Sequence, residues 1–345
     1  MSVLEAPVAP ASVDDYFESR AADVDADIAT VREGLAELGR RGLPEADLPA
    51  SIAMVAEVAR HDMATAFSAW AHRMVIEYIS LSPSDSSARA ALPALGTAGT
   101  LGATALAAGT AHVLAGVELP ITFREDGDDI VLEGRIAWAS NLIAPFVVVA
   151  AAAHVDDPGR TVVVAIPGDS DGLWVAPRPK LLALQATGSS FVKIDRVRLP
   201  RSAAVSDDLT TFARTVLPRF LLLQSAFCSG IANRALDEAS GNSQPMGESI
   251  RPRLDDTRAA LDEADAHMHR LAQDAGIDTP TAEVLGLRLR YSELATEAVH
   301  LEQCLAGGRG YLADSPTARR VREVAFLPVQ APTEVLLRWL LQRSA

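Results

Sequence analysis

Cysteine is nearly absent from this sequence of 345 residues, which contains only Cys228 and Cys304. Neither belongs to a recognisable disulfide or metal-ligand pattern, so we expect reduced thiols of the kind found in cytosolic proteins. The first twenty residues lack the basic start and apolar stretch of a signal peptide. The most apolar run, residues 142–153, is too short to cross a bilayer and contains Pro145. We therefore expect a soluble, cytoplasmic protein.

Aromatic residues are also scarce, at 5% of the chain, although 49% of the residues are hydrophobic. A core built mainly from Ala, Val and Leu is typical of a globular, mainly helical protein. The 31 basic residues are outnumbered by 45 acidic ones, which gives a net charge of −14. An acidic surface without basic clusters argues against nucleic acid and anionic membranes as partners.

Motifs for several common chemistries are missing. The seven histidines are scattered, no HExxH, CxxC or acidic metal-binding loop occurs, and we expect no metal site. No GxSxG or phosphate-binding GxxxxGK[ST] motif is present. Taken alone, "GGRGY" (307–311) is typical of a helix C-cap and "TARRVRE" (317–323) of a solvated helix face. Taken alone, Trp138 is more typical of a core aromatic than of the floor of a planar ligand site.

Periodicity divides the chain into three parts. Apolar residues recur at helical spacing in two N-terminal and three C-terminal segments: 13–41, 51–81, 209–240, 252–275 and 281–306. Alternating strand-like runs with Asp-Gly and Asp-Pro-Gly turn signals occupy the middle, between about 97 and 205. Pro332 and Thr333 are typical of the first turn of a last helix. The pattern predicts helices, then a β-domain, then a helix bundle.

Five ordered blocks resemble the acyl-CoA dehydrogenase family, and they span nearly the whole chain. The first, residues 57–79, is similar to an N-terminal family helix, and "ATALAAGT" (103–110) is similar to "a-L-T-E-P-x-A-G-S". "GRIAWASN" (134–141) resembles "G-x-K-x-W-I-T-N", and residues 182–200 resemble "lGlRat.S…l.F.dVrVP". "GGRGYLADSPTARRVRE" (307–323) resembles "GGxGY…P.eR..RD".

The resemblance implies an α+β, mainly α fold with three domains. These are an N-terminal helical domain (1–96), a middle antiparallel β-barrel domain (97–205) and a C-terminal four-helix bundle (206–345). The bundle makes a homo-oligomer, a dimer or tetramer, in the family. The resemblance also implies FAD held between the β-domain and the bundle. The residues that it assigns to cofactor binding are Thr104, Thr110, Trp138, Ser140, Gly307, Gly308 and Thr333.

Family chemistry needs a carboxylate that removes the α-proton of an acyl thioester while hydride leaves for the flavin. An ungapped match from Arg322 puts the usual catalytic Glu at Ala331. The alternative base position, on the first bundle helix, falls on Phe220. Neither side chain can accept a proton, so the catalytic residue stays unknown; the candidates are a residue such as Glu334, one turn into the last helix, or a base from a partner chain.

Contacts to the adenine half of FAD also look altered. Gln185 replaces an arginine of the resemblance, Cys304 replaces a glutamine, and residues 240–250 lack the expected arginine. Each lost charge-assisted contact to phosphate costs about 1.5–3 kcal/mol. These departures predict a retained flavin pocket with weakened pyrophosphate contacts.

Three functions remain open on these residues. The first is a flavin-dependent oxidoreductase acting on the CH–CH group of an acyl thioester such as acyl-CoA. It works either alone or as the degenerate subunit of a hetero-oligomer with a related chain. The second is a flavin-dependent monooxygenase or N-hydroxylase on the same fold, using loosely held FMNH2 or FADH2. The third is a non-catalytic family member.

Overall fold

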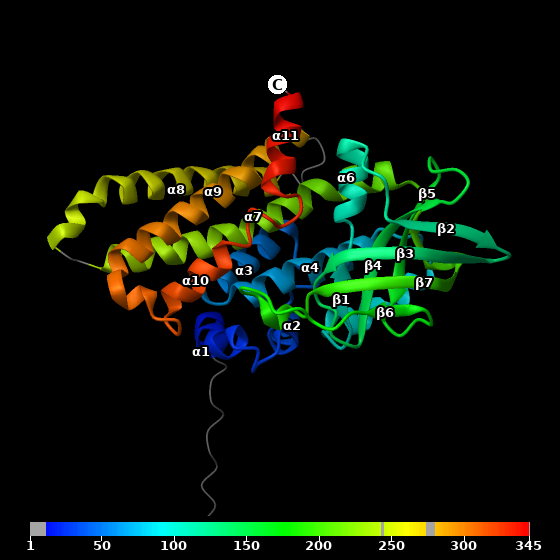
Figure 1. Cartoon of the computed structure of the whole chain (residues 1–345), viewed down its shortest axis with the longest axis horizontal. Helices are drawn as coiled ribbons and strands as arrows, with labels where there is room; N and C mark the ends of the chain where they lie inside the picture. The colour runs from blue at the N-terminus through cyan, green and yellow to red at the C-terminus, as the bar shows by residue number, and fades with distance from the viewer. Residues whose placement is uncertain (1–11, 243–244, 274–279, 345) are drawn as a thin grey trace, which may run out of the picture.

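The computed structural model describes residues 12–242, 245–273 and 280–344, and statements about structure refer to these. The N-terminal part is helical (Figure 1). Its α-helices are α1 (Val13–Asp25), α2 (Val31–Arg40), α3 (Leu48–His61), α4 (Met63–Ser80) and α5 (Leu92–Gly96). Helix α4 is buried on nearly every side, and its alanines allow neighbouring elements to approach closely. It forms the centre of the molecule, between the sheet and the bundle.

The predicted helical stretch 51–81 is two helices rather than one. Asp62 has extended backbone angles, and its side chain accepts a hydrogen bond from the backbone N–H of Thr65. Capping of this kind satisfies donors that the start of a helix leaves free. Asp62 therefore ends α3 and begins α4, a break that the apolar periodicity did not predict.

The middle part is one eight-stranded sheet with helix α6 (Ala107–Ala115) inserted after its first strand. The strands are β1 (Leu101–Thr104), β2 (Ile121–Asp126), β3 (Asp129–Ala139), β4 (Phe146–His154), β5 (Thr161–Pro167), β6 (Leu173–Val175), β7 (Ser190–Pro200) and β8 (Ala204–Ser206). Their order is β6-β7-β3-β2-β4-β5-β8, with β1 on β4. The sheet is mixed, not purely antiparallel as expected, because β1 and β2 both pair with β4 in parallel.

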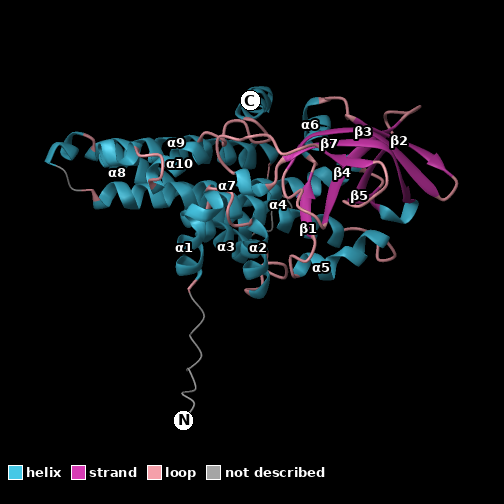
Figure 2. Ribbon diagram, turned by 60° about the horizontal axis from the view of Figure 1, so that its bottom comes forward, coloured by secondary structure: helices cyan, strands magenta, loops and turns pink. Residues whose placement is uncertain are grey.

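The C-terminal part begins with long helices that lie side by side and ends with two shorter ones (Figure 2). They are α7 (Leu209–Gly241), α8 (Arg251–Gln273), α9 (Thr281–Ala306), α10 (Pro316–Val324) and α11 (Glu334–Ser344). By length and composition α7 could cross a membrane, but 89% of its most apolar window is buried inside the structure. Its apolar character therefore reflects its place in the core. The division at residues 96/97 and 205/206 stays a prediction, and β8 runs one residue past the second boundary.

One buried side chain ties the N-terminal helices to the sheet. Asn141 follows β3, and its amide nitrogen donates to the carbonyl oxygens of Ser68 (3.0 Å) and Gly102 (2.9 Å). Ser68 belongs to α4 and Gly102 to β1, so the end of β3 is held against both. This contact positions the neighbouring Trp138 and Ser140.

The interpretation of residues 317–323 as a solvated helix face was wrong. In α10, Arg320 is 3% exposed and pairs with Glu302 of α9, which is 1% exposed. Arg319 donates to the carbonyl oxygen of His61 at 2.7 Å. A charged run can be buried in this way when each cation has a partner. The segment fastens the bundle to the N-terminal helices.

Candidate functional site

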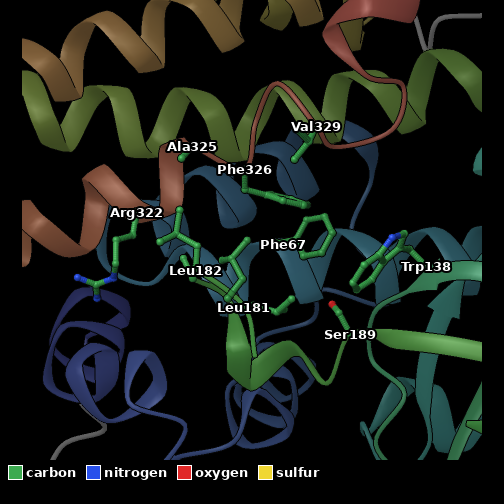
Figure 3. A pocket seen from close by; sticks show the side chains of 11 residues that line it. Phe67, Trp138, Leu181, Leu182, Ser189, Arg322, Ala325, Phe326 and Val329 are labelled. Atoms are coloured by element: carbon green, nitrogen blue, oxygen red, sulfur yellow. The ribbon is translucent and has the colours of Figure 1, made fainter. Parts of the chain in front are cut away.

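A cleft of about 240 Å³ lies where the sheet, α4 and the α10–α11 connection meet (Figure 3). Three aromatic side chains, those of Phe67, Trp138 and Phe326, face this space together with Val329. The remaining lining residues are Leu181, Leu182, Ala183, Leu184, Ser189, Arg322 and Ala325. The lining is thus largely apolar, with few polar groups, as is typical of a small-molecule site.

Trp138 is not the core aromatic that its sequence context suggests. It is 52% exposed, and its ring lies 4.4 Å from that of Phe191, centroid to centroid, at a tilt of 46°. Covering the exposed face of the indole ring would remove apolar surface from water, which is favourable. A planar ligand that stacks in the cleft would do this.

A chain of hydroxyl groups runs along the cleft wall. Thr187 donates to the carbonyl oxygen of Leu184, and the Ser189 hydroxyl lies 2.7 Å from the Thr187 hydroxyl. The Ser140 hydroxyl lies 2.7 Å from that of Ser189. Because each hydroxyl has one proton, the first bond directs the others, and Ser140 donates to Ser189. Lone pairs of Ser140 remain available to a ligand.

The 181–184 segment of the lining is shaped by Gln185. Its side-chain oxygen accepts from the backbone N–H of Leu181 (2.9 Å), and its amide nitrogen donates to the carbonyl oxygen of Pro179 (3.2 Å). The side chain is thus committed to holding the loop. Gln185 also begins a short 3-10 turn. The residues on either side of this turn, Leu184 and Gly188, both have left-handed backbone angles.

The connection between α10 and α11 is held by a buried polar network. Arg288 of α9 is fully buried and donates to the Gln330 side-chain oxygen (2.8 Å), the Leu327 carbonyl (3.3 Å) and the Gln224 side-chain oxygen (3.2 Å). Gln224 in turn donates to the carbonyl oxygen of Ala331 at 3.0 Å. These bonds fix the backbone on which Ala331 sits.

Phe220 lies in the core of the bundle, with Trp70 packed edge-on at 4.9 Å between ring centroids. The Trp70 indole N–H donates to the Phe220 carbonyl at 3.1 Å. Phe220 and Thr110 also line a second cavity, of only about 10 Å³. That is about the space for one water molecule. Leu221, Leu222 and Leu223 are buried beside Phe220 as bundle core.

Comparison with known proteins was made by sequence and by structure. No protein-family model matches the chain. A probable acyl-CoA dehydrogenase of Mycobacterium leprae is 25% identical over 94% of this chain and 90% of its own. The mitochondrial short-chain specific acyl-CoA dehydrogenase of Bos taurus is 26% identical over 63% of this chain and 56% of its own.

Solved structures agree with these relatives in fold. Butyryl-CoA dehydrogenase from Megasphaera elsdenii superposes with a TM-score of 0.83 at 16% identity, covering 99% of both chains. A glutaryl-CoA dehydrogenase in complex with glutaryl-CoA gives a TM-score of 0.83 at 18% identity, covering 96% of this chain and 92% of that one. The chain has the fold of the acyl-CoA dehydrogenases and is similar in sequence to probable acyl-CoA dehydrogenases over nearly its whole length. The expected fold is confirmed, and these relatives support the resemblance of the five sequence blocks.

The cofactor-binding residues that family resemblance suggests are not all in one place. Trp138 lines the cleft, and Ser140 contacts it through Ser189. Thr104 ends β1, and Thr110 lies on α6 at the small cavity. Gly307 ends α9 with a left-handed φ of 58°, beside Gly308, and both are exposed. Thr333 caps α11, accepting from the backbone N–H of Leu336 at 3.3 Å.

The last helix begins at Glu334, two residues after Pro332. Glu334 receives a hydrogen bond from Arg338 (2.9 Å), which also pairs with Glu293. Its carboxylate is thereby held along α11, and it is not among the residues that line the cleft. No acidic residue is among them in the part of the chain that the structure describes.

Sequence reasoning missed most of the lining. Phe67, Leu181, Leu182 and Phe326 come from three segments that meet only in the folded chain. Their sequence signal was ordinary hydrophobicity, which predicts burial rather than a cleft. The Gln224–Arg288–Gln330 network was missed for the same reason, since its members lie on separate elements.

Proposed function

We propose that this chain holds a flavin, FAD, in the cleft beside Trp138. We further propose that it serves as the base-lacking subunit of a hetero-oligomeric flavoenzyme that oxidises an acyl thioester. One observation carries the proposal: the cleft is lined by a half-exposed tryptophan and the hydroxyl group of Ser189 but, among the described residues, by no acid. The mitochondrial and glutaryl-CoA relatives are named as acyl-CoA dehydrogenases, which suggests the thioester class.

The cleft fits part of a flavin better than a whole dinucleotide. Its volume of about 240 Å³ is below the ~300–1,000 Å³ of pockets that enclose whole ligands. A fused ring against Trp138 would fill it, and the remainder of FAD would extend outward. A flavin bound there supplies the hydride acceptor for oxidation of a CH–CH bond. The role of Trp138 is to stack, and that of Ser140 is to accept a hydrogen bond.

A proton acceptor within reach of the substrate is the part that is missing. General-base catalysis requires a basic atom about 2.6–3.2 Å from the proton's carbon or linked by one water. Ala331 and Phe220 have none, and the Gln224 and Arg288 bonds hold the Ala331 backbone in place. A small shift of this loop would not bring an acid into position. The base therefore comes from a partner chain in this proposal.

Room for the substrate is also lacking next to Thr110 and Phe220, where the cavity holds about 10 Å³. Both a self-sufficient dehydrogenase and a monooxygenase need a substrate cavity beside the flavin. A base-lacking subunit does not need a complete substrate cavity of its own, because in this proposal the partner chain completes the cavity beside the flavin and supplies the base. This difference favours the hetero-oligomer over the other readings.

Trp138→Ala tests the flavin half of the proposal. We expect a flavin affinity at least about tenfold weaker, because stacking contributes about 0.5–1.5 kcal/mol beyond area burial. Trp174→Ala is the matched control, since Trp174 is 56% exposed on β6 and does not line the cleft. Fluorescence quenching of added FAD measures both. Equal affinity of the two variants would disprove the proposed site.

Co-expression tests the partner half. We would purify the chain alone and after co-expression with each catalytic family member of the same organism. An absorbance spectrum of each preparation would then show how much flavin is bound. We expect a stable complex with more bound flavin than the chain alone. A chain that is yellow and bleached by acyl-CoA on its own, or that consumes oxygen with reduced flavin, would contradict the assignment.

A further inference from the structure

Four ionisable side chains meet where α1 crosses α3. Asp14 and Glu18 are four residues apart on α1, and Glu57 and His61 are four residues apart on α3. Residues at this spacing share a helical face. The two helices are packed together in the N-terminal part of the molecule (Figure 1). The cluster contains none of the residues that line the flavin-type cleft, so it is a second site to explain.

The orientation of His61 is set by one of the carboxylates. The Nδ1 atom of His61 lies 2.6 Å from Glu18 Oε2, and Arg234 donates to the same oxygen at 2.8 Å. Glu18 accepts from both, which lowers the pKa of Glu18 to about 2 even though partial burial acts in the opposite direction. Because a carboxylate only accepts, the neutral ring of His61 carries its proton on Nδ1, which Arg234 Nη1 also approaches at 3.2 Å, and Nε2 presents a lone pair.

That lone pair has no hydrogen-bond partner. His61 is 8% exposed, and its Nε2 atom is buried without a donor or acceptor at bonding geometry. It faces Glu57 Oε1 at 3.4 Å and Asp14 Oδ1 at 3.5 Å. Three electron-rich atoms thus converge on one point.

We propose that Asp14, Glu57 and His61 bind a divalent transition-metal ion, with Glu18 orienting the histidine. One ligand atom from each residue lies within 4.8 Å of the others. Two ligands at about 2.0–2.1 Å from a tetrahedral ion are about 3.3–3.4 Å apart. The separations of 3.4 and 3.5 Å from Nε2 match this edge length. A cation at the centre would neutralise the crowding.

The donor set indicates which ion binds. One imidazole nitrogen and two carboxylate oxygens suit Zn²⁺ and neighbouring first-row ions better than Mg²⁺ or Ca²⁺, which prefer oxygen ligands only. The Nδ1–H bond to Glu18 is the carboxylate–histidine–metal arrangement that raises the basicity of a ligand. Asp14 and Glu57 are partly exposed, so a water molecule can complete the coordination.

Binding would fasten α1 to α3. Two ligands come from α3 and one from α1, so the ion bridges the two helices. Asp25, at the end of α1, forms an ion pair with Arg322, which lines the cleft. The sequence did not predict the site because Asp14 is far from Glu57 and His61 along the chain. Neither Asp14 with Glu18 nor Glu57 with His61 forms a known metal-binding motif.

Calorimetric titration of the purified, chelator-treated full chain with ZnCl2 tests the proposal. We expect one ion per chain and a rise in melting temperature, because an ion that binds only the folded state stabilises it. Glu57→Gln and Asp14→Asn, at partly exposed positions, should each weaken Zn²⁺ binding at least tenfold. His61→Gln should abolish it.

Two controls exclude other ligands. His267→Gln removes a histidine that pairs with Glu283 alone (2.8 Å), and Cys304→Ser removes a thiol 3.6 Å from His300. Neither should change the affinity. A wild-type chain that binds no Zn²⁺, or binding that survives Glu57→Gln and Asp14→Asn but is lost in Cys304→Ser, overturns the proposal.

Discussion

At the scale of single residues, buried polar side chains specify how the parts of this chain fit. His72 of α4 is 3% exposed, accepts from the backbone N–H of Gly102 at Nδ1 (2.9 Å), and donates from Nε2 to the Leu95 carbonyl (2.9 Å). It thereby links α4 to β1 and α5 in a neutral form. Burial lowers the pKa of His72 to about 4, since the charged form loses its hydration.

This burial predicts acid sensitivity. The folded pKa of His72 lies below its ordinary value of about 6.5, so the unfolded state binds the proton first as the pH falls. Stability from neutral His72 is complete above pH 6.5 and is lost between about pH 6.5 and 4, by about 3 kcal/mol. We expect His72→Gln to show a shallower loss over that range in urea unfolding. Parallel pH profiles of the two proteins would refute this.

At the scale of elements, the contact of α3 with α7 depends on one glycine. A Cβ atom at Gly230 of α7 would lie 2.1 Å from the carbonyl oxygen of Ala56 and 2.7 Å from the Cβ of Ala59. Backbone atoms of α3 cannot move away cheaply, because α3 also packs on α1 and α4. The two helices can therefore approach this closely only because residue 230 has no side chain.

Gly230→Ala should reduce the free energy of unfolding by about 1–3 kcal/mol or more through overpacking. Gly286→Ala in α9 is the matched control, since its Cβ would meet only Leu341 Cδ2, at 3.9 Å. That change should stabilise the protein by about 0.5–1 kcal/mol, because alanine favours a helix over glycine. Chemical denaturation of both variants decides, and equal effects would contradict the close approach.

Helices and strands were largely predictable, because apolar periodicity records which face each element buries. The Asp-Gly turn and the alternating runs predicted β2, β3 and β7, and the all-round apolar pattern predicted a buried α7. The break at Asp62 was not predictable from periodicity, since a cap interrupts the chain without changing the pattern. The burial of Arg320 depends on Glu302 of another helix, which no local pattern contains.

At the scale of the whole molecule, the candidate site exists only because distant segments meet. Trp138 and Ser140 could be identified through the family resemblance, and Ala331 and Phe220 could be identified as positions without a base. The small size of the cavity at Thr110 and the network around Arg288 could not, because the cavity depends on packing among α4, α6 and α7 and the network joins α7, α9 and the α10–α11 connection. The sequence thus predicted the absence of the usual catalytic base better than it predicted the residues that surround the candidate site.

Introducing a carboxylate at position 331, where the family has its catalytic Glu, should not by itself create dehydrogenase activity. Ala331→Glu adds an acid to a backbone segment that Gln224 and Arg288 hold in place. A base displaced by about 1 Å loses on the order of 100-fold in rate. We expect no rapid reduction of bound flavin by a simple acyl-CoA in stopped-flow absorbance. Reduction at the rate of a catalytic relative would show that the base alone was missing.

The central claim is that this chain can hold a flavin but cannot itself remove the α-proton of a thioester. Anaerobic addition of a short-chain acyl-CoA to the FAD-reconstituted chain, followed by flavin absorbance, tests it most directly. We predict no bleaching by the chain alone and bleaching once the catalytic partner chain is present. Rapid bleaching of the isolated chain would contradict the account.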